Sequence, residues 1–170
     1  IHMERIFYFS TFLFLLDQSH LYAQSAWSQK KDLNIARATG VGFSIADKGY
    51  VGTGGNPNTG IAKDFWEYDP STNVWTQKAD LGGEERQFAV GFAIGEYGYI
   101  GTGNGGDSFD DFWQYDPVSN TWTEKAKYPG GKRMWAVGFS IGDKGYIGTG
   151  TNQGSEFRKD FYEYDPATDT

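Results

Sequence analysis

Three arginines stand at matching places in a sequence that is otherwise poor in residues suited to chemistry. Arg37, Arg86 and Arg133 each precede an apolar run, and Phe88 and Trp135 follow the last two arginines at a spacing of two residues. A guanidinium group can hold a carboxylate through paired hydrogen bonds, and an aromatic ring beside it offers a stacking surface. These five residues are therefore the candidate ligand-binding site. The structural alternative is that the arginines bond nearby backbone or an Asp, and that the aromatic residues pack between structural units.

Composition removes most other kinds of site. The chain has no Cys, and its two histidines, His2 and His20, lie in an N-terminal segment that we expect to be removed. Thiol nucleophiles, Ser-His triads and His/Cys metal sites are then excluded. We predict no catalytic residue, no metal site and no cofactor. A net charge of −7 without a basic run also argues against nucleic acid as a partner.

One sequence unit is repeated three times along the chain. Each copy has a first half of fourteen residues that ends in Gly-Thr-Gly and a second half that ends in Tyr-Asp-Pro. The first halves are 41–54, 90–103 and 137–150, and the second halves are 64–70, 111–117 and 160–166. A period of 47 to 49 residues indicates a repeat architecture.

Each unit predicts four short strands. In the first unit these are 40–45, 50–53, 64–68 and 74–78, separated by turn residues such as those of 47–49 and 69–73. We expect Gly49 to supply a positive φ in the first turn. The repeats show no helical apolar stripe, so the predicted fold class is all-β.

These motifs resemble Kelch repeats. That family builds one four-stranded propeller blade per repeat, and the resemblance covers residues 26 to 170. It implies blades at about 37–83, 86–130 and 133–170 within a propeller segment that spans 25–170. The last blade lacks the tryptophan strand marked by Trp75 and Trp122, and residues 26–30 (Ala-Trp-Ser-Gln-Lys) resemble that strand. We expect residues 26–30 to complete the third blade.

Three blades are too few for a ring, because propellers close with four to eight blades. We therefore expect a homodimer with six blades, in which the N-terminal strand is exchanged or stays in its own chain. The other interpretation is that the sequence is part of a longer propeller chain.

The first 24 residues differ in character from the repeats. Ile1 and His2 before Met3 suggest a cloning residue, and a charged start followed by eleven mostly apolar residues at 6–16 is typical of a secretory signal peptide. The apolar run is too short to span a membrane. The alternative is a hydrophobic first strand. We expect a secreted, periplasmic or cell-surface protein of a bacterial envelope.

The predicted function is a binding module for a protein or carbohydrate ligand. In such a propeller the loops at 55–63, 104–110 and 151–159 lie on the same side as the three arginines, and loops on a rigid scaffold commonly bind ligands. The alternative is a sugar-acting enzyme similar to the Kelch-type sialic acid epimerases, which work with Arg and carboxylate groups.

Overall fold

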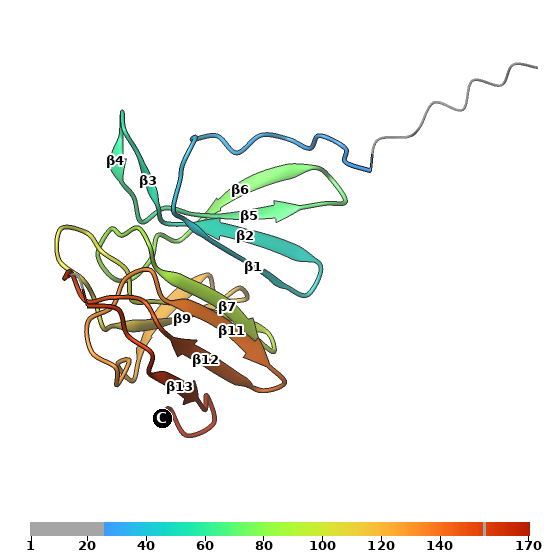
Figure 1. Ribbon diagram of the computed structural model, residues 1–170. Helices are drawn as coiled ribbons and strands as arrows, with labels where there is room; N and C mark the ends of the chain where they lie inside the picture. The colour runs from blue at the N-terminus through green and yellow to red at the C-terminus, as the bar shows by residue number, and fades with distance from the viewer. Residues whose placement is uncertain (1–25, 155) are drawn as a thin grey trace, which may run out of the picture.

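The computed structural model describes residues 26–154 and 156–170. The proposed signal peptide lies outside the described residues. The described residues form strands, turns and loops and contain no helix. Three antiparallel sheets lie side by side like a fan (Figure 1), as expected for propeller blades.

Blade 1 and blade 2 are complete four-stranded sheets. Blade 1 has the strand order β1-β2-β5-β6, and blade 2 has the order β7-β8-β9-β10. The strands of blade 1 are β1 (Val41–Ile45), β2 (Lys48–Gly52), β5 (Phe65–Asp69) and β6 (Val74–Lys78). The strands of blade 2 are β7 (Val90–Ile94), β8 (Tyr97–Gly101), β9 (Phe112–Asp116) and β10 (Thr121–Lys125). A small hairpin, β3 (Gly55–Asn56) with β4 (Gly60–Ile61), lies in the loop of blade 1.

Blade 3 has three strands among the described residues. They are β11 (Val137–Ile141), β12 (Lys144–Gly148) and β13 (Phe161–Tyr164), paired in that order. Residues 26–30 form no strand and do not pair with β13. The expectation that they complete blade 3 is therefore wrong within one chain, because blade 2 separates them from β13 (Figure 1).

The hydrophobic core is divided between the two junctions of the fan. One buried cluster joins blades 1 and 2 and includes Phe65, Ile100 and Tyr115. The other joins blades 2 and 3 and includes Phe112 and Tyr164. Burial of aromatic rings between neighbours is the main source of stability in such stacked repeats, so each blade depends on the one beside it.

The first hairpin turn of each blade differs from the prediction. The residue with positive φ is Ala46, Gly95 or Gly142, one position after the first strand, as in a two-residue turn of type II′. Gly49 instead lies inside β2, paired with Tyr68 of β5. The predicted role of Gly49 in the turn is therefore wrong.

Candidate functional site

The three arginines lie inside the blades. Arg86 has no exposed side-chain surface, Arg133 is 1% exposed and Arg37 is 9% exposed. Each guanidinium group forms a bidentate ion pair with the aspartate that begins the second half of its own unit: Asp64, Asp111 or Asp160. The expectation that these groups face the channel mouth is wrong, and the structural alternative is what the structure shows.

Arg86 illustrates how complete this bonding is. Its Nη1 donates to Asp111 Oδ1 at 2.6 Å and to the Thr102 carbonyl at 3.0 Å, its Nη2 donates to Asp111 Oδ2 at 2.7 Å, and its Nε donates to the Glu84 carbonyl at 3.1 Å. Its guanidinium also lies 4.5 Å from the centre of the Phe109 ring. All three guanidinium nitrogens of Arg86 thus form hydrogen bonds within the protein.

The aspartates are held ionised by these contacts. Burial of Asp111 opposes its ionisation, but hydrogen bonds from Arg86 and from Trp113 Nε1 outweigh burial and keep its pKa below the ordinary value. Asp160 is more exposed, and the hydrogen bonds from Arg133 are the main reason that its pKa is lowered. These carboxylates are poor candidates for a general acid, which must carry a proton near neutral pH.

The arginines hold a strained stretch of backbone. Thr53, Thr102 and Thr149 have φ of +56°, +58° and +63°, a left-handed conformation that β-branched residues rarely adopt. The carbonyl of each threonine accepts a hydrogen bond from the arginine of its own blade. Each arginine therefore fixes the point where the second strand leaves the sheet and the variable loop begins.

Of the two candidate aromatic residues, Trp135 is exposed and Phe88 is half-buried beside it. Phe88 and Trp135 meet edge to face with ring centres 5.1 Å apart, and Trp135 is 54% exposed. Thr39 holds the equivalent place in blade 1 and is exposed. We call these three residues the aromatic rim.

Backbone hydrogen bonds between blades fix the rim. Thr39, Phe88 and Trp135 have φ of +59°, +59° and +56°. The Phe88 N–H donates to the Thr39 carbonyl at 3.1 Å, and the Trp135 N–H donates to the Phe88 carbonyl at 3.2 Å. Three unusual backbone conformations in matching places are thus stabilised by the neighbouring blade, and Trp135 is held at the surface by a rigid main chain.

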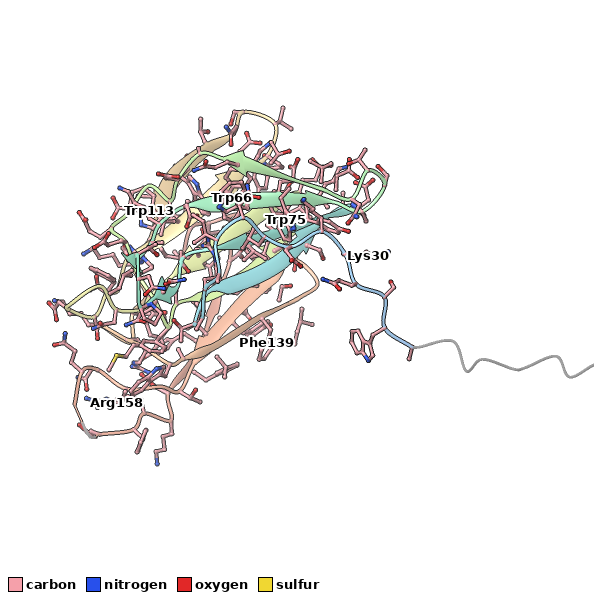
Figure 2. The ribbon with its side chains drawn as sticks, turned by 90° about the horizontal axis from the view of Figure 1, so that it is seen from above. Lys30, Trp66, Trp75, Trp113, Phe139 and Arg158 are labelled. Carbon is pink, nitrogen blue, oxygen red and sulfur yellow. The ribbon has the colours of Figure 1, made fainter. Side chains whose placement is uncertain are left out.

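The variable loops lie beside the rim, as predicted. Isolated bridges join the residue before each rim position to the loop of its blade: Ala38 to Gly55, Gln87 to Asn104 and Met134 to Thr151. Contacts also tie neighbouring loops together, since Gln153 Nε2 donates to the Gly106 carbonyl at 3.0 Å and Lys132 pairs with Asp107. Arg158, in the third loop, is labelled in Figure 2. The loops and the rim form one continuous face.

The inner strands β1, β7 and β11 lie next to one another and line a shallow hollow. Its volume is about 350 Å³, and its walls come from residues 42–44, 91–93 and 138–140. Ser44 and Ser140 contribute hydroxyl groups, and glycine backbone makes up much of the remaining wall. The hollow can accept a small polar group, but it carries no charged side chain.

Sequence reasoning missed a set of capping residues at the outer strands. Asn73, Asn120 and Asp169 share a positive φ, and the Oδ1 atom of each accepts two hydrogen bonds. Asn120 Oδ1 accepts from the Ala79 N–H at 2.9 Å and from the Tyr115 hydroxyl at 2.9 Å, linking the end of blade 1 to blade 2. The signal was present, because an Asn or Asp recurs there in all three units.

Within residues 26–154 and 156–170, no group of three or more His, Cys, Asp or Glu side chains could hold a metal ion. The described residues also include no helix that is long and apolar enough to cross a membrane.

Comparisons with known proteins agree with the fold. Residues 97–127 match the Kelch motif. The solved structure of YjhT is similar, with a TM-score of 0.71 and 21% sequence identity. The likeness covers 82% of this chain and 52% of that one, so the chain spans about half the length of the structure it matches. A search of curated proteins found no match.

Proposed function

We propose that this Kelch-repeat protein is a binding module whose ligand is a carbohydrate that docks on the aromatic rim. The observation that carries the proposal is the placement of Trp135, which is half exposed, supported by Phe88 and fixed by backbone hydrogen bonds to the next blade. A rigid aromatic side chain loses little conformational entropy on binding. The apolar face of a sugar ring packs well on such a surface.

The surroundings of the rim support a polar, uncharged ligand. Thr39 offers a hydroxyl group close to the Gln87 side chain, with Oγ1 3.3 Å from Oε1. The nearby charges of Lys132 and Asp107 already neutralise each other. Because the arginines are also paired, the earlier reason to expect an acidic ligand no longer holds. Neutral glycans are therefore the first probes.

The experiment is a glycan array followed by titration. We expect retention of neutral glycans by the wild-type protein and a loss of affinity of about tenfold or more for Trp135→Ala. Trp135→Phe should retain part of the affinity, because it keeps an aromatic face. Val118→Ala is the matched control, since Val118 is 93% exposed and lies in the turn after β9. Equal binding by Trp135→Ala and wild type would refute the rim as the site.

The same array separates a binder from the enzyme alternative. Retention of unchanged sugar supports the binding module, whereas conversion of a sugar to a new product would support a sugar-acting enzyme. If no glycan is retained, a protein ligand on the loop face becomes the better interpretation, and the carbohydrate proposal fails.

We also propose that the protein acts outside the cytoplasm, where envelope glycans are found. This proposal rests on the N-terminal sequence pattern alone. Fractionation of cells that express the full sequence tests it, and recovery of the uncleaved protein in the cytoplasm would contradict it.

A further inference from the structure

The buried arginines of the three blades differ in what covers them. In blade 2 the Arg86 guanidinium lies over the Phe109 ring, 4.5 Å from the ring centre. In blade 3 the Arg133 guanidinium lies 5.3 Å from the centre of the Tyr128 ring. Among the described residues, no aromatic ring stacks on the Arg37 guanidinium of blade 1. Because a planar guanidinium packs well on an aromatic face, blade 1 lacks a contact that the other two blades have.

The missing ring can be traced to one residue of the loop. Phe109 and Ala62 each stand two positions before the aspartate that pairs with the arginine of their own blade. The N–H of Phe109 donates to the Gly103 carbonyl, and the N–H of Ala62 donates to the Gly54 carbonyl, both at 2.9 Å. Ala62 therefore holds the place of Phe109 in the repeat, with a methyl group where blade 2 has a phenyl ring.

A pocket of about 220 Å³ lies at this place in blade 1. Its lining includes Ala62, Arg37, Asp64 and Trp66. The pocket leads from the blade interior to the surface, because Trp66 (labelled in Figure 2) is buried whereas Thr59, also on the lining, is exposed. A cavity of about 150 Å³ is enough to hold benzene, so this pocket has room for one six-membered ring.

The walls of the pocket are tied together by hydrogen bonds. Figure 1 shows the β3–β4 hairpin beside the segment that leads into β1. Asn56 of the hairpin donates through Nδ2 to the Ala36 carbonyl at 2.7 Å, and its Oδ1 accepts from the Asn58 N–H at 2.7 Å. A β-bridge between Ala38 and Gly55 joins the same two segments. All lining residues belong to blade 1 or to the segment before it, so the pocket is formed without any other blade.

The charges at the base of the pocket neutralise each other. Arg37 donates to both carboxylate oxygens of Asp64, at 2.8 and 2.6 Å, and Trp66 Nε1 donates to Asp64 Oδ2 at 2.7 Å. The cation and the anion are thus already paired, and neither is available to hold a ligand of opposite charge. The planar guanidinium can still stack on a ring, as that of Arg86 does on Phe109.

We propose that this pocket binds a small, uncharged aromatic ring, which takes the place that Phe109 holds in blade 2. The Arg37 guanidinium stacks on the face of the ring, and Trp66 and Ala62 supply apolar contacts. The ring of a free phenol and that of a tyrosine side chain share this chemistry. None of the aromatic rim residues lines the pocket, so the inference does not depend on carbohydrate binding at the rim.

The first test is a titration with 4-fluorophenol followed by ¹⁹F NMR. We expect one site per chain with a Kd of about 1 mM, which is typical of a ligand with a single ring. Phenol should displace the probe, whereas cyclohexanol should compete much less, because it has no aromatic face. Benzoate should bind no more tightly than phenol. Absence of binding, or equal competition by phenol and cyclohexanol, would refute the proposal. Competition by N-acetyltyrosine amide at lower concentration than phenol would identify a polypeptide side chain as the source of the ring.

The Ala62→Phe variant places the probe at this pocket. The new side chain should fill the pocket as Phe109 fills its equivalent, so the affinity for 4-fluorophenol should fall by about tenfold or more while Tm stays equal to or above that of the wild type. Val118→Phe is the matched control, because it adds the same ring in an exposed turn and should bind like the wild type. Equal binding by Ala62→Phe and wild type would overturn the assignment of the site.

The Phe109→Ala variant gives the reverse test. It should open an equivalent pocket beside Arg86 and raise the number of bound probe molecules from one to two per chain. This variant keeps the Ala62 pocket, so it tests the proposal even if Ala62→Phe does not fold. A single site in folded Phe109→Ala would contradict the argument that loss of the covering ring creates the binding site.

Discussion

Replacing Arg86 by Ala should destabilise the fold strongly, because the change leaves a partly buried carboxylate without its cation. Removing one partner of a buried ion pair costs about 3–5 kcal/mol. The Asp111 side chain keeps 18% of its surface exposed, so water can solvate part of its charge, and we expect a value near the lower limit, about 3 kcal/mol. The Thr102 carbonyl also loses its hydrogen bond from Nη1.

Urea and thermal melts measure this effect. For a chain of this size a loss of about 3 kcal/mol corresponds to a fall in Tm of roughly 6–12 °C. Arg158→Ala is the control: Arg158 pairs with Glu156 at 3.2 Å in an exposed loop, and exposed pairs contribute about 1 kcal/mol or less. If Arg86→Ala is no more destabilising than Arg158→Ala, the argument that Arg86 has a structural role is refuted. Asp111→Ala and the double variant complete a cycle that isolates the pair.

Two further perturbations test the junctions and the charges. Trp122→Ala should cost about 3 kcal/mol, because it removes a ring packed on Phe65 of blade 1 and opens a cavity. Trp75→Ala should cost less, because the Trp75 ring packs on Tyr68 of its own blade; equal losses in denaturant melts would contradict this. Since the pKa of Asp160 is lowered in the folded state, its pairing stabilises the protein above the ordinary carboxyl pKa of about 4 and is lost as the pH falls below that value. The urea concentration at the unfolding midpoint should therefore fall when the pH is lowered below about 4. The Asp160→Asn variant should be less stable at neutral pH, and its midpoint should depend less on pH in this range.

The fold could be predicted from the sequence because every blade is encoded locally. The strands predicted at 64–68 and 74–78 correspond to β5 and β6 within one residue, since alternating apolar residues and Asp-Pro turns specify short strands. The turn glycine was misplaced because the positive φ falls on Ala46, ahead of Gly49. At the equivalent position in blade 2, a Cβ at Gly98 would collide with the Phe43 ring of blade 1, and such a contact between blades leaves no local signal in the sequence.

The candidate site was predicted only in part. The sequence located Phe88 and Trp135 on the loop side, but the arginines could not be assigned, because a recurring Arg fits either a ligand or an internal aspartate. What decides between them is the backbone path, which brings Asp111 within 2.6 Å of Arg86 across 25 residues. Asp64, Asp111 and Asp160 recur at matching places in the repeat, and this recurrence is the sequence signal for the internal ion pairs.

The cap formed by Asp169 has a consequence for protein engineering. Its Oδ1 accepts from the Ala126 N–H at 3.1 Å and the Tyr164 hydroxyl at 2.8 Å, as Asn120 does one blade earlier. The backbone at Asp169, with φ of +57°, therefore already has the direction that leads Asn120 into Thr121 and Trp122. A gene that joins Thr170 directly to Trp27 of a second copy would therefore keep the repeat in frame without any linker.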